Sequence, residues 1–488
     1  MGIVVRQSVS NTVITYAGFA IGAVNTLLMY PQILGDTFYG LTAFLLSTAN
    51  LVMPIMAFGA HSTIIKYFNG YTAEEERSRF LSFMLVLPLG IALVIFALCF
   101  WFYKEIAGVL SIRNAIVFDY IWQIPVIALC MGYFEIFYAW VKVHLQSVFG
   151  NFIKEVLIRL LITALLIAVY VRSLSIVDFI YATVVVYAVA ALLMGIAAYR
   201  VRQFRFSKRL PVNRRQIVTY SLFIIFSGSI ATLLLDVDKF MLAQYIAIEQ
   251  IAYYSVAVFI ATSVAVPGRA MQQITYPITA KLMSEGKWEQ LNDLYKKSSI
   301  TLQIAGGYVL LGILINIKMV YAFLPPAYSN GIFAVFAIGI SRYFDLMLGI
   351  NNAIIFNSKY YRVVLLLGLG LAVVAVGLNA TLIPTMYIDG AALATLLAIA
   401  LYTLAKLFFV VVRMNLNPFT LKNVYLVVLS VGLFGVFYFW DFNFHPLLSI
   451  VVKSTLFSVA YGFGVYFFRF SDDANQFIKM AGQKLRLK

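Results

Sequence analysis

About fourteen apolar segments follow one another along this 488-residue chain, with only short connections between them. A helix of about 20 apolar residues is long enough to cross a lipid bilayer. Within hydrocarbon, only helices and closed barrels satisfy their own backbone polar groups. We therefore predict an all-α integral membrane protein with about fourteen transmembrane helices. The segments run approximately over residues 8–31, 40–67, 80–103, 117–143, 149–171, 176–199, 216–246, 251–280, 299–324, 330–357, 360–383, 388–412, 421–440 and 447–469.

The composition agrees with this class. Hydrophobic residues make up 62% of the chain and charged residues 11%, whereas soluble domains carry about 25% charged residues. The net charge of +16 is explained by Lys and Arg on the cytoplasmic side of a multi-pass protein. We therefore expect the lipid bilayer as a partner and no nucleic acid.

The basic residues also predict the topology. With the N-terminus inside, the outside connections hold mainly Lys104, Arg113 and Arg172. Because basic residues favour the cytoplasmic side, we predict that both termini are cytoplasmic. The basic residues assigned to the inside are Arg6, Lys66, Arg77, Arg79, Lys142, Lys154, Arg159, Lys281, Lys287, Lys296, Lys297, Lys359, Arg362, Arg413, Lys422 and those of the C-terminal tail.

The stretch RVRQFRFSKRLPVNRR, residues 200–215, has seven basic residues and no acidic one. Six predicted helices precede it, six follow, and two more end the chain. An even number of helices per half gives both halves the same orientation, so their pseudo-two-fold axis runs along the membrane normal. We predict a six-helix bundle over 1–200, a cytoplasmic linker over 201–215, a second bundle over 216–412, and two additional helices with a basic tail over 413–488.

Sequence signatures of catalysis are absent. The chain has no G-x-x-x-x-G-K-[ST] phosphate loop, no H-E-x-x-H pair and no G-x-S-x-G turn, and no connection is long enough for a soluble domain. The two cysteines, Cys99 and Cys130, lie in apolar runs and indicate no disulfide framework. We expect no enzyme, no catalytic residue, no cofactor and no metal site.

Ionisable groups inside membrane helices are costly and usually face a partner or a water-filled cavity. In GISRYFDLMLGINNAIIF, Arg342 lies about 18 Å from the outer end of its helix, and Asp345 lies three residues on, on the same face. Either the two form a structural ion pair or Arg342 lines a central cavity. Asn351 and Asn352 follow further down and fit a wet lining.

A second polar group lies in VPGRAMQQITYP. Arg269 follows a Pro-Gly pair that can kink the helix, and Gln272 and Gln273 lie just below it. We interpret these three residues as cavity lining, with an Arg269 that reaches the inner interface as the alternative. Glu135, in the fourth segment, is a further candidate for the lining.

Small and polar residues recur along one face of the first helix, at steps of four, three, four and three. This pattern predicts either a helix–helix contact or a cavity lining, and the sequence leaves both open. The residues are Asn11, Thr15, Gly18, Gly22 and Asn25.

The run LLLDVDKFML, residues 233–242, holds Asp236, Asp238 and Lys239. Asp236 is about 30 Å along its helix from Arg215, which predicts a position near the outer surface. The triplet is then either an interfacial ion cluster or a polar gate at the outer mouth of a cavity.

Two stretches resemble the bacterial polysaccharide or oligosaccharide flippases of the multidrug/oligosaccharidyl-lipid/polysaccharide exporter superfamily. They are DVDKFMLAQYIAIEQIAYYSVAVF, 236–259, and YPQILGDTFYGLTAFLLSTANLVMPIMAFGAHSTIIKYF, 30–68. Ala252 departs from the glycine that is common in the family. The first helix also has a sparse set of positive charges compared with the related lipid II flippases.

The resemblance implies two six-helix bundles in a V shape, alternating access, and an undecaprenyl-diphosphate-linked oligosaccharide as cargo for surface polysaccharide synthesis. It also implies the bacterial inner membrane and a polysaccharide polymerase as a further candidate partner; a monomer is the default expectation. Arginine suits the diphosphate, so Arg269 and Arg342 are the predicted substrate contacts. The alternatives are a cation-coupled exporter of small molecules that uses Glu135, and a membrane-bound polymerase.

Overall fold

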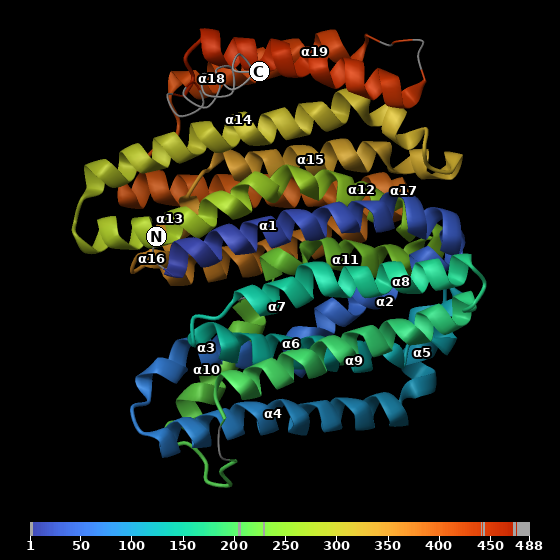
Figure 1. Ribbon diagram of the computed structural model, residues 1–488, viewed down its shortest axis with the longest axis vertical. Helices are drawn as coiled ribbons and strands as arrows, with labels where there is room; N and C mark the ends of the chain where they lie inside the picture. The colour runs from blue at the N-terminus through green and yellow to red at the C-terminus, as the bar shows by residue number, and fades with distance from the viewer. Residues whose placement is uncertain are drawn as a thin grey trace. The chain divides into compact units, whose positions relative to one another are not determined.

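The computed structural model describes residues 3–203, 206–227, 230–440, 442, 445–471 and 475, and every regular element within them is a helix (Figure 1). The predicted all-α fold is confirmed. The long apolar runs form helices because a helix satisfies its backbone hydrogen bonds within one segment. Side chains cap the start of some helices. Thr420 and Asn423 form a capping box before Leu421, and Ser175 accepts from the backbone of Asp178.

Nine helical stretches of the described chain are long and apolar enough to cross a membrane, or ten if the bent pair Pro326–Met347 and Asn351–Asn357 is one span. Two of the nine, Ser10–Met56 and Arg362–Met414, are 47 and 53 residues long, and each covers two predicted segments. The predicted segments 149–171 and 216–246 fall on shorter helices, and residues 228–229 lie outside the described chain. The number fourteen therefore stays a prediction.

The chain divides into two compact units, Met1–Ser255 and Val256–Lys488. The first unit includes α10 and α11, which follow the basic stretch 200–215. Ser221 of α10 hydrogen-bonds to Thr63 of α3 across 2.8 Å between their hydroxyl oxygens, and α11 packs on α2. The predicted division into bundles at 201–215, with its symmetry, stays a prediction.

The helices of the first unit, including α12, which continues past its boundary, are α1 (Ile3–Val24), η1 (Asn25–Leu34), α2 (Gly35–Met56), α3 (Ala60–Tyr67), η2 (Phe68–Gly70), α4 (Glu74–Trp101), α5 (Tyr103–Ser111), η3 (Ala115–Asp119), α6 (Gln123–Val143), α7 (Val148–Phe152), η4 (Ile153–Leu157), α8 (Ile158–Tyr170), α9 (Ile176–Val201), α10 (Arg214–Ser227), α11 (Ile230–Tyr245) and α12 (Ile248–Thr262). Two of them, η1 and η4, are π-helical.

The helices of the second unit are η5 (Ser263–Ala265), α13 (Val266–Ser284), α14 (Trp288–Tyr321), η6 (Pro326–Gly331), α15 (Ile332–Met347), α16 (Asn351–Asn357), α17 (Tyr361–Met414), α18 (Leu421–Tyr438) and α19 (Pro446–Phe467). Within α17, Tyr387 has a φ of 54° and separates two helical arms. These arms correspond to the predicted segments 360–383 and 388–412.

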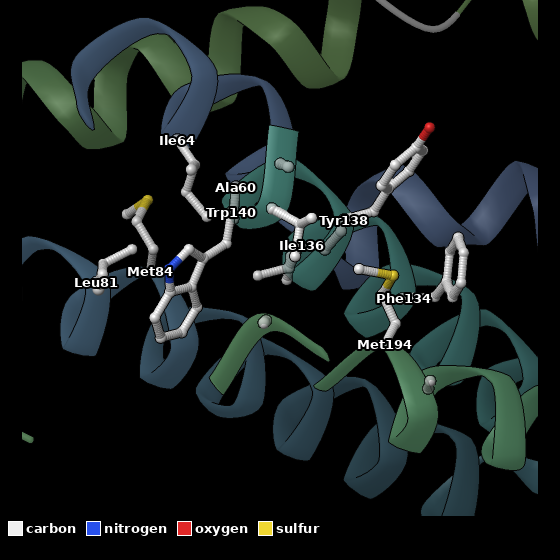
Figure 2. Close-up of a cluster of buried hydrophobic side chains, with 14 of the residues drawn as sticks. Ala60, Ile64, Leu81, Met84, Phe134, Ile136, Tyr138, Trp140 and Met194 are labelled. Carbon is white, nitrogen blue, oxygen red and sulfur yellow. The ribbon is translucent and has the colours of Figure 1, made fainter. Parts of the chain in front are cut away.

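The core of the first unit surrounds one half of α6, the half that the predicted topology places toward the cytoplasm. Figure 2 shows the buried side chains of α6 among those of α3, α4 and α9. Trp140 and Ile136 are almost completely buried, and each such large side chain contributes about 1.5–3 kcal/mol in water-based transfer measurements. This packing fixes the turn of α6 that carries Glu135. The labelled side chains are Ala60, Ile64, Leu81, Met84, Phe134, Ile136, Tyr138, Trp140 and Met194.

In the second unit, α18 and α19 pack on α14 around an apolar cluster that includes Leu311, Leu426 and Phe457. Buried polar pairs support this contact: Asn423 donates to Gln303 Oε1 at 2.7 Å, and the Tyr461 hydroxyl donates to a carbonyl of α14 at 2.9 Å. The last two predicted helices therefore belong structurally to the second unit.

Candidate functional site

The polar groups of the second unit converge on Asp345 of α15. The Nζ atom of Lys406, on α17, donates to Asp345 Oδ1 at 2.8 Å and to Asn352 Oδ1 at 3.2 Å. The lysine side chain is 1% exposed, whereas the aspartate side chain is 38% exposed. Such pairing is how a membrane helix accommodates ionisable groups. We call Arg342, Asp345, Asn352 and Lys406 the Asp345 cluster.

Arg342 lies one helical turn before Asp345 on α15 and is half-buried. Its charge acts favourably on the Asp345 carboxylate. The sequence left open whether Asp345 pairs with Arg342, and the structure adds a second cation, Lys406. Two cations and one anion leave the cluster with one net positive charge, so its chemistry suits an anionic ligand.

A bend in the chain brings Asn352 to this cluster. The axis turns by 54° between α15 and α16, and Gly349 in the break has a φ of +56°, a conformation that glycine adopts without strain. A Cβ atom at Gly349 would also lie 2.7 Å from the backbone nitrogen of Ser299. Gly349 is therefore required both for the bend and for the close approach to α14.

Sequence reasoning missed Lys406. It is the only charged residue in the apolar run ALATLLAIALYTLAKLFFVVV, 392–412, and a lone lysine inside a predicted membrane helix is a signal for a buried partner. Its stem passes Tyr402, one turn earlier, and Nζ lies 4.4 Å from the centre of that ring. A cation–π contact thus adds to the two hydrogen bonds.

The other predicted residues of this unit lie elsewhere. Asn351 is buried and donates to the Tyr295 hydroxyl at 2.6 Å, so it serves the packing of α14 rather than a wet surface. Arg269 is exposed on α13 and Gln272 is half-buried. Among the described residues, neither has a polar contact with the Asp345 cluster. The side chain of Gln273 lies outside the described residues.

In the first unit, Glu135 of α6 pairs with Lys154 of η4, with 2.5 Å between Oε1 and Nζ. Lys142 and His61 are close enough for their charges to act on the same carboxylate. We call these four residues the Glu135 cluster. The sequence assigned Lys142 and Lys154 to inside connections, but the structure places them within helices α6 and η4. Glu135 is therefore not an isolated carboxylate.

The polar stripe of the first helix is a helix–helix contact. Asn11 donates to Ser147 Oγ at 2.9 Å, and Asn25 donates to the Arg159 carbonyl at 3.1 Å. Thr15 bonds within its own helix to the Asn11 carbonyl at 2.8 Å. Of the two alternatives, the contact is what the structure forms; a role of these residues in binding substrate stays a prediction.

Gly18 makes the closest approach in this contact. A Cβ atom there would lie 2.3 Å from the carbonyl oxygen of Glu155, in η4. The Gly18 carbonyl accepts a hydrogen bond from Arg159, which also pairs with Glu155 at 3.1 Å. The arginine thus ties the π-helical turn that carries Lys154 to α1. Single π-helical turns are often found at functional sites.

The triplet Asp236, Asp238 and Lys239 lies inside α11 and not at its end. Ser47 and Asn50 of α2 hydrogen-bond to Asp236, and Tyr254 donates to buried Asp238 at 2.6 Å. Asp236 is nine residues before the end of α11, about 14 Å along the axis. A position near the outer surface stays a prediction. The role as a gate stays a prediction.

The two stretches that carry the family resemblance are in contact. Thr37 donates to Glu249 Oε1 at 2.8 Å, Tyr253 donates to Asp36 Oδ2 at 2.8 Å, and Gly40 lies against the backbone of Ile248. The segment 30–68 and residues 236–255 of the second stretch are therefore in contact within the first unit. No group of three or more His, Cys, Asp or Glu side chains in the described chain could hold a metal ion.

The chain is similar to known proteins in fold and, over more than half its length, in sequence family. The family model for "Polysaccharide biosynthesis protein" matches residues 4–283. None of the curated proteins compared with the chain matches it. Among solved structures, lipid II flippase MurJ in an inward closed conformation superposes with a TM-score of 0.73 at 13% identity, covering 93% of this chain and 98% of MurJ.

Multidrug transporters share the fold as well. The MATE transporter DinF-BH in complex with R6G has a TM-score of 0.61 at 13% identity, covering 85% of this chain and 96% of that one. An inward-facing MATE family transporter of the MOP superfamily has a TM-score of 0.55 at 14% identity, with 85% and 95% covered. These likenesses show that the chain has the fold of these multi-pass membrane transporters. With a family model that matches more than half of its residues, the chain belongs to the polysaccharide biosynthesis protein family.

Proposed function

We propose that this protein is a flippase that moves undecaprenyl-diphosphate-linked oligosaccharide from the cytoplasmic to the outer leaflet of the bacterial inner membrane, for synthesis of a surface polysaccharide. The observation that carries the proposal is the Asp345 cluster, which holds a net positive charge within membrane helices of a polysaccharide biosynthesis protein. A guanidinium such as Arg342 binds phosphate oxygens in a bidentate manner. The protein acts as a monomer by alternating access, with both termini cytoplasmic.

The charge of the cargo supports outward movement. A diphosphate is anionic, and a membrane potential that is negative inside favours its export by about 2.3 kcal/mol per charge per 100 mV. The exposed carboxylate of Asp345 complements the role of Arg342, because carboxylates accept hydrogen bonds from hydroxyl groups such as those of sugars. A polysaccharide polymerase would receive the product on the outer side.

A flipping assay with the purified protein in liposomes tests the proposal. It compares a polyprenyl-diphosphate-linked oligosaccharide with a lipophilic cation, each labelled in its polar part. We expect the sugar lipid to change leaflets and the cation to stay. Movement of the cation alone would contradict the proposal.

The second candidate is a cation-coupled exporter of small molecules. One observation favours it: the Asp345 side chain is 38% exposed and so presents a carboxylate to a passing cation. The net positive charge of its cluster opposes such a cargo, because the like charges of Arg342 and a cation repel each other. Glu135 is not available as an isolated carboxylate, since Lys154 pairs with it.

A further inference from the structure

The Glu135–Lys154 pair in the first unit has an unusual distribution of exposure. The Lys154 side chain is 49% exposed and that of Glu135 is 16% exposed. Lys154 lies six residues into the helix that starts at Val148, about 9 Å along its axis. An ammonium group at such a position in an apolar segment is stable only where it faces water or an anion. The open side of Lys154 is therefore a place where an anion can approach.

The surroundings of the pair are cationic. Lys142, two helical turns after Glu135 on α6, and His61 of α3 both act electrostatically on the Glu135 carboxylate. The Lys142 ammonium lies 3.7 Å from the centre of the Tyr138 ring, and His61 Nδ1 is buried without a hydrogen-bond partner among the described residues. Glu135 thus lies beside two lysine ammonium groups and a buried imidazole. If its carboxylate leaves Lys154, the site becomes strongly attractive to another anion.

The neighbouring pair does not have this property. Glu155 and Arg159 lie on the same helix as Lys154, at 3.1 Å, and Arg159 also donates to the Gly18 carbonyl. Both groups are therefore committed to the contact between α1 and α8. The remaining helices that pack on α6, namely α2, α4 and α9, contribute no charge that acts on Glu135.

We propose that Glu135 is a built-in counter-ion that competes with the substrate diphosphate for Lys154. The diphosphate oxygens displace the carboxylate when the headgroup enters, and the carboxylate returns to Lys154 as the headgroup leaves. No bond is made or broken, and each state keeps the lysine paired with an anion. This inference rests on the proposed function, and it gives Glu135 the task of release rather than of binding.

Such a competitor has a physical purpose. A site that only attracts the diphosphate would hold it too tightly for turnover, and transport requires binding that is weak enough to allow exit. Under the predicted topology, Lys154 lies near the cytoplasmic end of its helix. The exchange would thus occur where the headgroup first enters the protein.

The test measures binding of farnesyl diphosphate to the full-length protein in detergent, at one pH. For Glu135→Gln we expect about tenfold tighter binding, because close charge pairs couple by at least about one order of magnitude in affinity. For Lys154→Gln we expect binding about tenfold weaker. The double variant should bind like Lys154→Gln alone, since Glu135 acts through that lysine. A gain in affinity cannot come from misfolding, so the first variant separates the proposal from mere structural damage.

Glu155→Gln is the matched control. It removes the same charge from a residue next to Lys154 in the chain, and we expect farnesyl diphosphate affinity within about twofold of the wild type. Equal tightening by Glu155→Gln and Glu135→Gln would contradict a specific exchange. Wild-type affinity of Glu135→Gln would overturn the exchange but leave the proposed function standing. If the wild type itself failed to bind farnesyl diphosphate while it flipped the lipophilic cation, both proposals would fall.

Discussion

The Glu135–Lys154 pair of the first unit and the Asp345–Lys406 pair of the second consist of the same chemical groups but are exposed in opposite senses. In the first the lysine is 49% exposed and the acid 16%; in the second the lysine is 1% exposed and the acid 38%. The first pair therefore offers a cation to its surroundings, and the second offers an anion. Two ion pairs of the same chemical groups inside a membrane protein can therefore present opposite charges to a ligand, because burial decides which of the two groups is accessible.

The consequence for the second unit concerns Arg342. Lys406 donates hydrogen bonds to Asp345 and Asn352. It also neutralises the Asp345 carboxylate, which Arg342 would otherwise have to compensate. In the proposed function, Arg342 is the cation of the Asp345 cluster that contacts the diphosphate. In the first unit Lys154 itself faces the ligand, and Glu135 regulates its availability.

The largest effect is expected from Lys406→Met. Removing one partner of a buried ion pair costs about 3–5 kcal/mol; because Asp345 is 38% exposed, we expect the lower end, about 3 kcal/mol. Thermal unfolding in detergent measures the loss of stability. The double variant Lys406→Met/Asp345→Asn should recover most of it, since no uncompensated charge remains. If the double variant were as unstable as the single one, the lysine would be needed for packing rather than for charge.

Arg342→Ala should change transport more than stability. We expect the rate of sugar-lipid flipping to fall by between about tenfold and a hundredfold. The reason is that a charge-assisted hydrogen bond contributes about 1.5–3 kcal/mol. The flipping assay in liposomes measures the rate, and thermal unfolding serves as the control. Arg342→Lys should restore only part of the rate, because lysine lacks the planar fork of donors. A normal rate for Arg342→Ala would remove this residue from the site.

Parts of these two clusters were predictable and parts were not. Arg342, Asp345 and Glu135 stand out because ionisable residues are rare in apolar segments. Asn351 and Asn352 were both predicted to line a cavity, but only Asn352 contacts the Asp345 cluster, because the chain turns by 54° at the break that contains Gly349. No helical period carries across such a break. The contacts between residues far apart in the sequence, such as Lys154 with Glu135, depend on packing that one sequence does not encode in any local pattern.

The fold was more predictable than the partners of the charged residues. The all-α fold follows directly from the apolar segments, since hydrocarbon permits few alternatives. The partners of Asp236 do not follow from its segment, because Ser47 and Asn50 lie on another helix. The sequence explained Lys154 and Arg159 by the topology alone, so it gave no reason to expect their contacts within the first unit.

Gly18→Ala should affect the first unit alone. A Cβ atom would lie 2.3 Å from the Glu155 carbonyl, so α1 and η4 would have to separate, at a cost of about 1–3 kcal/mol for overpacking. Because η4 carries Lys154, we expect farnesyl diphosphate binding to weaken together with thermal stability. Gly312→Ala is the control, since a Cβ atom there meets nothing within 4 Å. Equal effects of the two substitutions would argue against a close contact at Gly18.

The smallest change in stability is expected from Lys154→Gln, although it removes the same charge as Lys406→Met. Its side chain is half exposed, and Lys142 still acts on the Glu135 carboxylate that the substitution leaves behind, so we expect a loss of at most about 1 kcal/mol and a thermal unfolding midpoint close to that of the wild type. Transport should nevertheless fall, because the cation offered to the headgroup is lost. The two lysines thus separate the two kinds of pair: one substitution acts mainly on folding and the other mainly on binding. A loss of stability as large as that of Lys406→Met would show that Lys154 is a structural counter-charge, and the difference between the units would then lie in exposure alone and not in function.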